Sequence, residues 1–169
     1  MCPAVAYLLT FSTYGTHLPG SEKGWVDAQH SVVGSPGLPP DPDLEAYWKS
    51  RLNGAPCVLD PELRLLTLRA ILTVCAHRKW TAHAVHVRTN HVHTVISGPV
   101  KPERMLSDFK AYATRAFRST DREVPLRRYW AKHGSTRYLW QEASLNAAVE
   151  YVLNGQGAKM ACYPVETKR

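Results

Sequence analysis

The hydrophobic residues of this chain form short β-type runs and longer helical repeats, separated by stretches rich in glycine and proline. The apolar run at 4–12 predicts a buried first strand. Two further β-rich runs, 80–88 and 91–97, are joined by the turn at 89–90, and so short a connection predicts an antiparallel hairpin. A short additional strand is expected over 137–140.

Three segments carry apolar residues at helical spacing. Asp60 is the predicted N-cap of a helix over 61–77, which has a proline in its first turn. A second helix is predicted over 102–118. A third, shorter helix is expected to begin at Ser144 as N-cap and to end at Gly155, where glycine suits a left-handed C-terminal conformation.

The predicted order is strand, helix, strand, strand, helix and short strand, which is the split βαβ or ferredoxin-like plan. We therefore expect an α+β fold, with an antiparallel sheet that carries two long helices on one face, leaves the other face available to a partner, and has an extra C-terminal helix. At 169 residues the chain is interpreted as one domain, 1–169. Residues 13–61 are rich in Gly and Pro and predict a surface insertion, with room for a short helix near 44–51.

The charge balance favours an anionic partner. The chain has 21 Lys and Arg against 14 Asp and Glu, a formal net charge of +7. Nucleic acid is the commonest anionic partner of a basic soluble domain, although solubility alone also explains such a surplus. The candidate contacts to phosphates and unpaired bases, each with a purely structural alternative, are Lys110, Arg115, Arg118, Trp25, Trp130 and Trp140.

Cysteine spacing and hydropathy indicate a cytoplasmic protein. The four cysteines include no C-x-x-C pair, so they are interpreted as reduced thiols and not as a zinc site or a disulfide framework. No apolar run approaches the roughly 20 residues of a membrane span. We expect a soluble protein with no membrane partner, associated with the nucleoid if it binds DNA.

Two histidines one residue apart, His91 and His93, lie on the second strand of the predicted hairpin. Side chains of a strand alternate between its faces, so both imidazoles project from the same side and can bind one cation. The alternative is a pair of half-buried histidines satisfied by hydrogen bonds. His86, on the paired strand, either supports this pair as a hydrogen-bond donor or is merely another strand histidine.

The third predicted helix holds a tyrosine away from its buried stripe. On a helical wheel Leu145 and Val152 share the apolar face, whereas Tyr151 points the other way. A tyrosine side chain that points away from the hydrophobic core, just before polar amide residues, has the position expected of a nucleophile. The alternative is a tyrosine at the helix margin with a solvated hydroxyl. The tyrosines that compete for this role are Tyr14, Tyr112, Tyr138 and Tyr163.

The triplet His91-Val92-His93, the late Tyr151 and the order of elements together resemble the single-tyrosine HUH transposases. These are small insertion-sequence enzymes and their REP-associated tyrosine transposase relatives. The similarity extends from the first strand, through the hairpin and the basic helix, to Trp140 and the tyrosine helix, and it leaves out 13–61.

The resemblance implies metal ligands at His91 and His93, a nucleophile at Tyr151, and Mg²⁺ or Mn²⁺ as cofactor. It also implies single-stranded or hairpin DNA as the partner and a 5′-phosphotyrosine intermediate in nicking and joining. Members of this family often form dimers that exchange the tyrosine helix, whereas domesticated relatives act alone, so a homodimer is one alternative. Two other readings stay open: a nucleic-acid-binding module of the same fold without catalysis, and a metal-dependent hydrolase that activates water.

The third metal ligand implied by the resemblance is a side-chain amide. The insertion-sequence enzymes usually place a glutamine four residues after the tyrosine, but Gly155 stands at that spacing here. If the helix breaks at Gly155, Gln156 can approach the histidines; if it stays regular, Asn154 is nearer. We take Gln156 as the predicted ligand.

Overall fold

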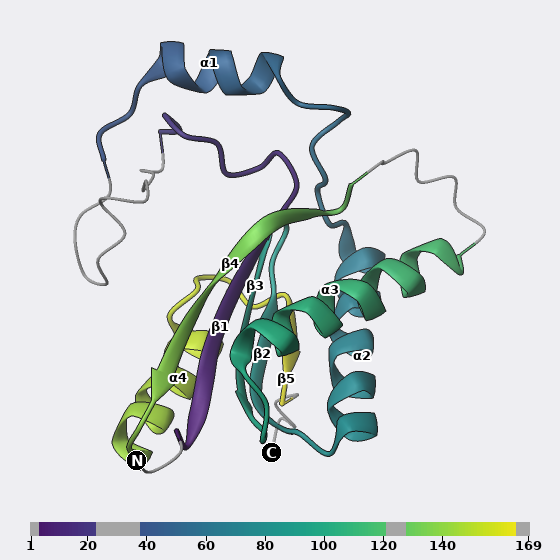
Figure 1. The fold of residues 1–169 in the computed structure, drawn as a ribbon, viewed down its shortest axis with the longest axis vertical. Helices are drawn as coiled ribbons and strands as arrows, with labels where there is room; N and C mark the ends of the chain where they lie inside the picture. Colours follow the sequence, from purple (N-terminus) through teal and green to yellow (C-terminus); the bar gives the residue numbers. More distant parts are fainter. Residues whose placement is uncertain (1–3, 23–37, 121–127, 165–169) are drawn as a thin grey trace.

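The computed structural model describes residues 4–22, 38–120 and 128–164. Its strands form one five-stranded antiparallel sheet in the order β4-β1-β3-β2-β5. Helices cover both faces of this sheet (Figure 1). The elements are β1 (Ala6–Thr13), α1 (Pro42–Ser50), α2 (Pro61–Arg78), β2 (Thr81–Val87), β3 (His91–Ser97), α3 (Pro102–Arg118), β4 (Trp130–Leu139), α4 (Glu142–Asn154) and β5 (Ala161–Tyr163).

The four strands β4-β1-β3-β2 have the ferredoxin-like order, which confirms the predicted α+β fold. Helices α2 and α3 lie on one face of the sheet, and α4 lies on the other (Figure 1). Each layer encloses its own apolar core. The larger core includes Phe11, Ile71 and Phe109, and the smaller one, under α4, includes Val95 and Val152.

Local sequence signals position the two long helices. The Asp60 carboxylate accepts a hydrogen bond from the Leu63 amide at 2.9 Å, which satisfies one of the unpaired donors at the start of α2. Helix α3 buries Phe109 and Phe117 against the sheet and exposes Arg104, Arg115 and Arg118, as its periodicity predicts. The buried Asp108 of α3 also pairs with Arg78 of α2 at 3.3 Å.

The structure corrects several predicted boundaries. The strand expected over 137–140 is much longer, and the short β5 was not predicted. Helix α4 has Gln141 as N-cap, not Ser144, so it begins three residues earlier than expected. Gly155 ends the helix as predicted, but with φ −83° it is not left-handed. The face expected to be open to a partner is partly covered by α4.

The described part of the predicted insertion contains helix α1, which buries none of its residues and stands away from the sheet (Figure 1). Two residues near its ends form hydrogen bonds to the segment that follows β1. The Gly20 carbonyl accepts a hydrogen bond from the Asp41 amide, and the Tyr14 hydroxyl accepts one from the Asn53 amide. Across the described ranges, no helix is both long and apolar enough to cross a membrane.

Candidate active site

Three histidines project from the sheet face that α4 covers. In the β2–β3 pairing, His86 lies opposite His93, and His91 precedes His93 by two positions on β3, on the same side. The intervening Val92 is buried in the opposite core, against α2 and α3. The ring centroids of His91 and His93 are 4.7 Å apart, so the structure brings together the pair predicted from the sequence.

His93 is buried and has one unsatisfied nitrogen. Its Nδ1 lies 2.8 Å from the Thr10 hydroxyl of β1, whereas its Nε2 has no hydrogen-bond partner in the described part of the chain. Burial, with a smaller contribution from the neighbouring His91, lowers the pKa of His93 to about 3. The imidazole is therefore neutral at physiological pH, with a lone pair suited to a cation.

The orientation of His91 is set by its neighbour in sequence. Its Nδ1 lies 2.6 Å from the Asn90 side-chain oxygen, and because that oxygen only accepts, Nδ1 carries the hydrogen. In the neutral ring the lone pair is then on Nε2, the tautomer required of a metal ligand. His17, in the segment after β1, has its ring 6.1 Å from that of His91, a proximity that the sequence did not suggest.

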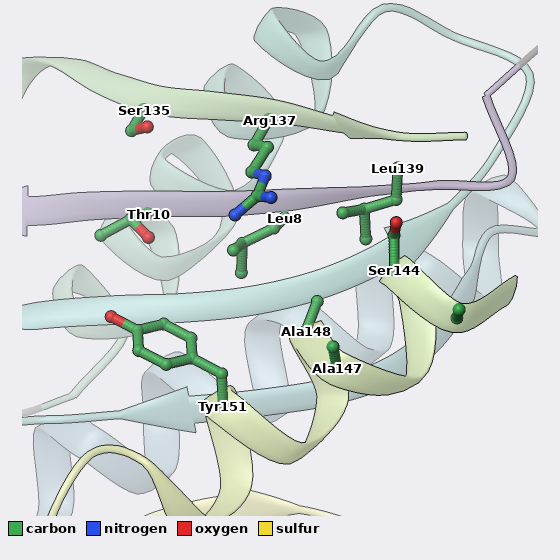
Figure 2. Close-up of a pocket in the computed structure, with 10 residues that line it drawn as sticks. Leu8, Thr10, Ser135, Arg137, Leu139, Ser144, Ala147, Ala148 and Tyr151 are labelled. Carbon is green, nitrogen blue, oxygen red and sulfur yellow. The ribbon is translucent and has the colours of Figure 1, made fainter. Parts of the chain in front are cut away.

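Tyr151 lies beside the histidine pair within the same chain. Its ring centroid is 5.7 Å from that of His93, with the planes at 79°. The residue is 47% exposed, so the phenol is available to a substrate. In Figure 2 its hydroxyl points along the sheet toward the side of Thr10. The helical wheel correctly predicted the buried stripe of α4, because Leu145, Ala148 and Val152 are buried.

The two candidate amide ligands, Asn154 and Gln156, have different surroundings at the end of α4. Asn154 donates to Glu150 at 2.8 Å on the exposed side of the helix. Because the helix ends at Asn154, Gln156 leaves the helical path, and its amide donates to the Tyr151 carbonyl at 3.4 Å. Gln156 lies near enough to His93 to oppose the lowering of its pKa, although it forms no regular hydrogen bond to Nε2.

His86 of β2 and Arg88, which follows that strand, form hydrogen bonds to the chain around the end of α4. The buried His86 donates from Nδ1 to the Val152 carbonyl at 3.0 Å and accepts at Nε2 from the Met160 amide at 3.2 Å. Arg88 donates to the Ala158 carbonyl. With both ring nitrogens engaged, His86 is a positioning residue for α4 and is not placed as a metal ligand.

The donor set around His93 fits a divalent cation. Three features support this fit: the unsatisfied Nε2 of His93, the tautomer of His91 and the amide of Gln156 near His93. In the ranges that the structure describes, no cluster of three His, Cys, Asp or Glu side chains forms a metal site. Two nitrogen donors favour a first-row cation such as Mn²⁺ over Mg²⁺, which prefers oxygen.

The predicted phosphate contacts lie on α3, on the opposite face of the sheet. Lys110 donates to the carbonyls of residues 131, 132 and 133 at 2.9, 3.5 and 3.1 Å, so its ammonium holds the start of β4. Arg115 stacks over Tyr112, and Arg118 is exposed. Arg115 and Arg118 line a depression of about 480 Å³ with Arg128, which we name the α3 basic depression.

The predicted stacking residues have different surroundings. Trp130 packs against Phe11 and Phe117, and its indole N–H donates a hydrogen bond to the Thr114 hydroxyl. Its role in the structure is therefore packing, the alternative to base stacking. Trp140 is 56% exposed and stacks on Tyr138 at the end of β4. Trp25 lies outside the described residues.

Two residues near the histidine pair were not found from the sequence. Thr10 is aligned with His93 only by the β1–β3 register, which no local pattern reveals. Arg137 of β4 projects over the same face, toward α4 (Figure 2). Its strand lacks a clean alternation of apolar and polar residues, so its sequence does not predict which face each side chain occupies.

Comparisons with known proteins bear on this site. The family of IS200-like transposases matches residues 57–153, more than half of the chain. That segment contains His91, His93 and Tyr151. A solved structure of a REP-associated tyrosine transposase bound to a REP hairpin has a similar fold, with a TM-score of 0.50 and 11% identity over 91% of this chain and 67% of that one. No curated protein gives a significant match.

Proposed function

The chain belongs to the IS200-like transposase family, and from this premise we propose that it nicks and rejoins single-stranded DNA with Tyr151 as the nucleophile. The observation that carries the proposal is the proximity of Tyr151 to His93 in one chain, with ring centroids 5.7 Å apart. The exposed phenol and the buried, neutral imidazole present a nucleophile and a cation ligand to the same space.

In the proposed reaction the Tyr151 oxygen attacks a phosphodiester phosphorus, and the bond from phosphorus to the 3′ oxygen breaks. The phenol loses its proton, and the departing 3′ oxygen gains one. The products are a 5′-phosphotyrosine and a free 3′-hydroxyl. A 3′-hydroxyl that attacks the phosphotyrosine reverses these changes and joins the strands, so one phosphoester bond is exchanged for another without any further energy source.

His91, His93 and Gln156 are the residues proposed to hold a divalent cation, Mn²⁺ or Mg²⁺. Such a cation supplies charge neutralisation at the phosphate and polarisation of its oxygen. Thr10 and Asn90 orient the two imidazoles through their Nδ1 atoms, which turns both Nε2 atoms away from these partners. The tie between His86 and Val152 keeps the Tyr151 helix over the pair.

A DNA hairpin is the proposed partner. The similar solved structure is described as bound to a REP hairpin. In this chain, the α3 basic depression gathers Arg115, Arg118 and Arg128 at one end of β4. Contacts between these arginine side chains and DNA phosphates depend on charge and not on the base sequence of the DNA. Such contacts suit the duplex stem of a hairpin.

The experiment that tests this proposal uses the full chain, Mn²⁺ and labelled single strands taken from the DNA that flanks the gene. A covalent protein–DNA adduct is expected on a denaturing gel, and Tyr151→Phe should abolish it. Tyr138→Phe is the matched control, because that tyrosine is also exposed but lies on another element. An adduct that persists in Tyr151→Phe contradicts the assignment.

The same experiment separates the two other interpretations. Cleavage without an adduct, retained in Tyr151→Phe, indicates hydrolysis by activated water. Salt-sensitive DNA binding that is unaffected by chelator, with neither cleavage nor adduct, indicates a binding module.

A further inference from the structure

A groove of about 600 Å³ lies between β4 and α4, and it has the volume of a small-molecule site. We name it the β4–α4 groove (Figure 2). Its walls are Leu8, Thr10, Ser135, Arg137, Leu139, Ala143, Ser144, Ala147, Ala148 and Tyr151. We propose that this groove binds one unpaired nucleotide of the DNA strand, next to the phosphate that Tyr151 attacks, with Arg137 as its phosphate contact.

Arg137 is the only charged side chain in the described walls of this groove. Its guanidinium extends from β4 across β1 and into the space that α4 borders (Figure 2). No described residue forms a hydrogen bond or an ion pair with it. An unpaired guanidinium with no acidic neighbour in the walls is complementary to a phosphate, which it can bind through two parallel hydrogen bonds.

The rest of the groove suits a nucleobase. Leu8 and Leu139 provide apolar surface on the sheet side, and Ala143 and Ala147 provide small side chains on the helix side. The small side chains leave a slot between the helix and the sheet, while the Ser135 and Ser144 hydroxyls supply polar contacts at its margins. A flat, largely apolar ring with polar edges matches this lining better than a compact anion such as free phosphate does.

The groove is continuous with the site of the proposed reaction. Tyr151 forms one end of it, and Thr10, which also lines it, contacts Nδ1 of His93 at 2.8 Å. Because β4 is the edge strand of the sheet, the backbone of a bound strand can leave over that edge. The inference therefore deepens the proposed function and rests on it for the identity of the ligand as DNA.

The proposed contact differs from the phosphate contacts expected from the sequence. Those residues lie on α3, across the sheet, and their depression suits a hairpin stem. Arg137 instead lies on the face that holds Tyr151, where the unpaired strand must enter if the phenol is to attack it. The chain thus offers separate surfaces for the paired and the unpaired parts of one substrate.

The test measures binding of a short fluorescein-labelled oligothymidine in EDTA, so that no catalysis intervenes. Arg137→Gln should weaken binding about tenfold and reduce the slope of log K against log salt by about 0.7. Arg137→Lys keeps the charge but not the paired hydrogen bonds, so it should restore the salt slope and only part of the affinity. Arg69→Gln removes the same charge from an exposed position of α2, on the other face of the sheet, and should leave binding unchanged.

A second pair of variants tests occupancy of the groove. Ala147→Phe fills the slot and should weaken binding by a similar factor. Asn146→Phe adds the same side chain at an adjacent exposed residue that does not line the groove, and should bind normally. Equal losses in Arg137→Gln and Arg69→Gln, or normal binding by Ala147→Phe, would overturn the proposal.

Failure of this inference and failure of the proposed function are distinguishable. If the natural chain forms no tyrosine adduct but Arg137→Gln selectively loses binding, the groove binds DNA and the proposed chemistry is wrong. If the adduct forms and both Arg137→Gln and Ala147→Phe bind normally, the groove assignment alone is wrong.

Discussion

The rings of His93 and Tyr151 lie edge to face within one chain, with centroids 5.7 Å apart and planes at 79°. One comes from β3 and the other from α4, and His86 of β2 and the adjacent Arg88 bind the chain near the end of that helix. A single copy therefore assembles the nucleophile and the cation ligands that we propose, without a tyrosine helix supplied by a second copy.

This arrangement predicts that mixing two inactive variants does not restore activity. His93→Ala removes a proposed ligand, and Tyr151→Phe removes the proposed nucleophile. If the tyrosine acts on the histidines of its own chain, an equimolar mixture forms no adduct, as scored on a denaturing gel. Adduct formation in the mixture would show that the tyrosine helix is exchanged between copies.

Thr10 is predicted to support metal binding through His93. Thr10→Val removes the hydroxyl that contacts Nδ1 and should weaken Mn²⁺ binding about 10- to 100-fold by calorimetry, the usual effect of losing a partner that orients a ligand. Thr94→Val is the matched control. Thr94 adjoins His93 on β3, and its buried hydroxyl has no hydrogen-bond partner within the described ranges. Equal losses in the two variants would refute the role of Thr10.

His86 is predicted to position α4. His86→Ala leaves the Met160 amide and the Val152 carbonyl without their partner and should lower the free energy of unfolding by about 1–3 kcal/mol. It should also slow adduct formation more than it weakens oligothymidine binding. Glutamine can both donate and accept, so His86→Gln should recover part of the rate. A variant that is destabilised but reacts at the normal rate would contradict the role.

The buried histidines predict a stability that falls on acidification. Burial lowers the pKa of His93 to about 3 and also lowers the pKa of His86. Unfolded histidine titrates near pH 6.5, so below that pH the unfolded chain binds more protons than the folded one. The stabilisation from His93 is complete above about pH 6.5 and is lost toward pH 3, at up to about 1.4 kcal/mol per pH unit, and His86 contributes in the same direction.

Urea unfolding in EDTA at pH 7 and pH 5.5 measures this dependence. His93→Gln does not titrate and should flatten the profile. A profile equally steep in that variant, or a folded chain that gains stability on acidification, would show that His93 is not held neutral by burial.

Local pattern was enough to predict much of this molecule. The period of two in a strand places His91 and His93 on one face whatever the surrounding fold, and the period of the helix keeps Tyr151 off the core. The sequence did not predict the features that depend on strand register or on weak local patterns. Thr10 meets His93 only through strand pairing, and the short β5 has too few residues to show a pattern. Ser144 is a favoured N-cap residue, yet the helix begins earlier, with Glu142 in its first turn.

The most direct test of the central claim is to map the residue that carries DNA in the adduct. The full chain is incubated with Mn²⁺ and single strands from the flanking DNA, the adduct is digested with protease and nuclease, and its peptides are sequenced by mass spectrometry. We predict a nucleotide joined through its 5′ phosphate to Tyr151. Attachment to another residue such as Tyr138 or Tyr163, or cleaved DNA with no modified peptide, would contradict the account.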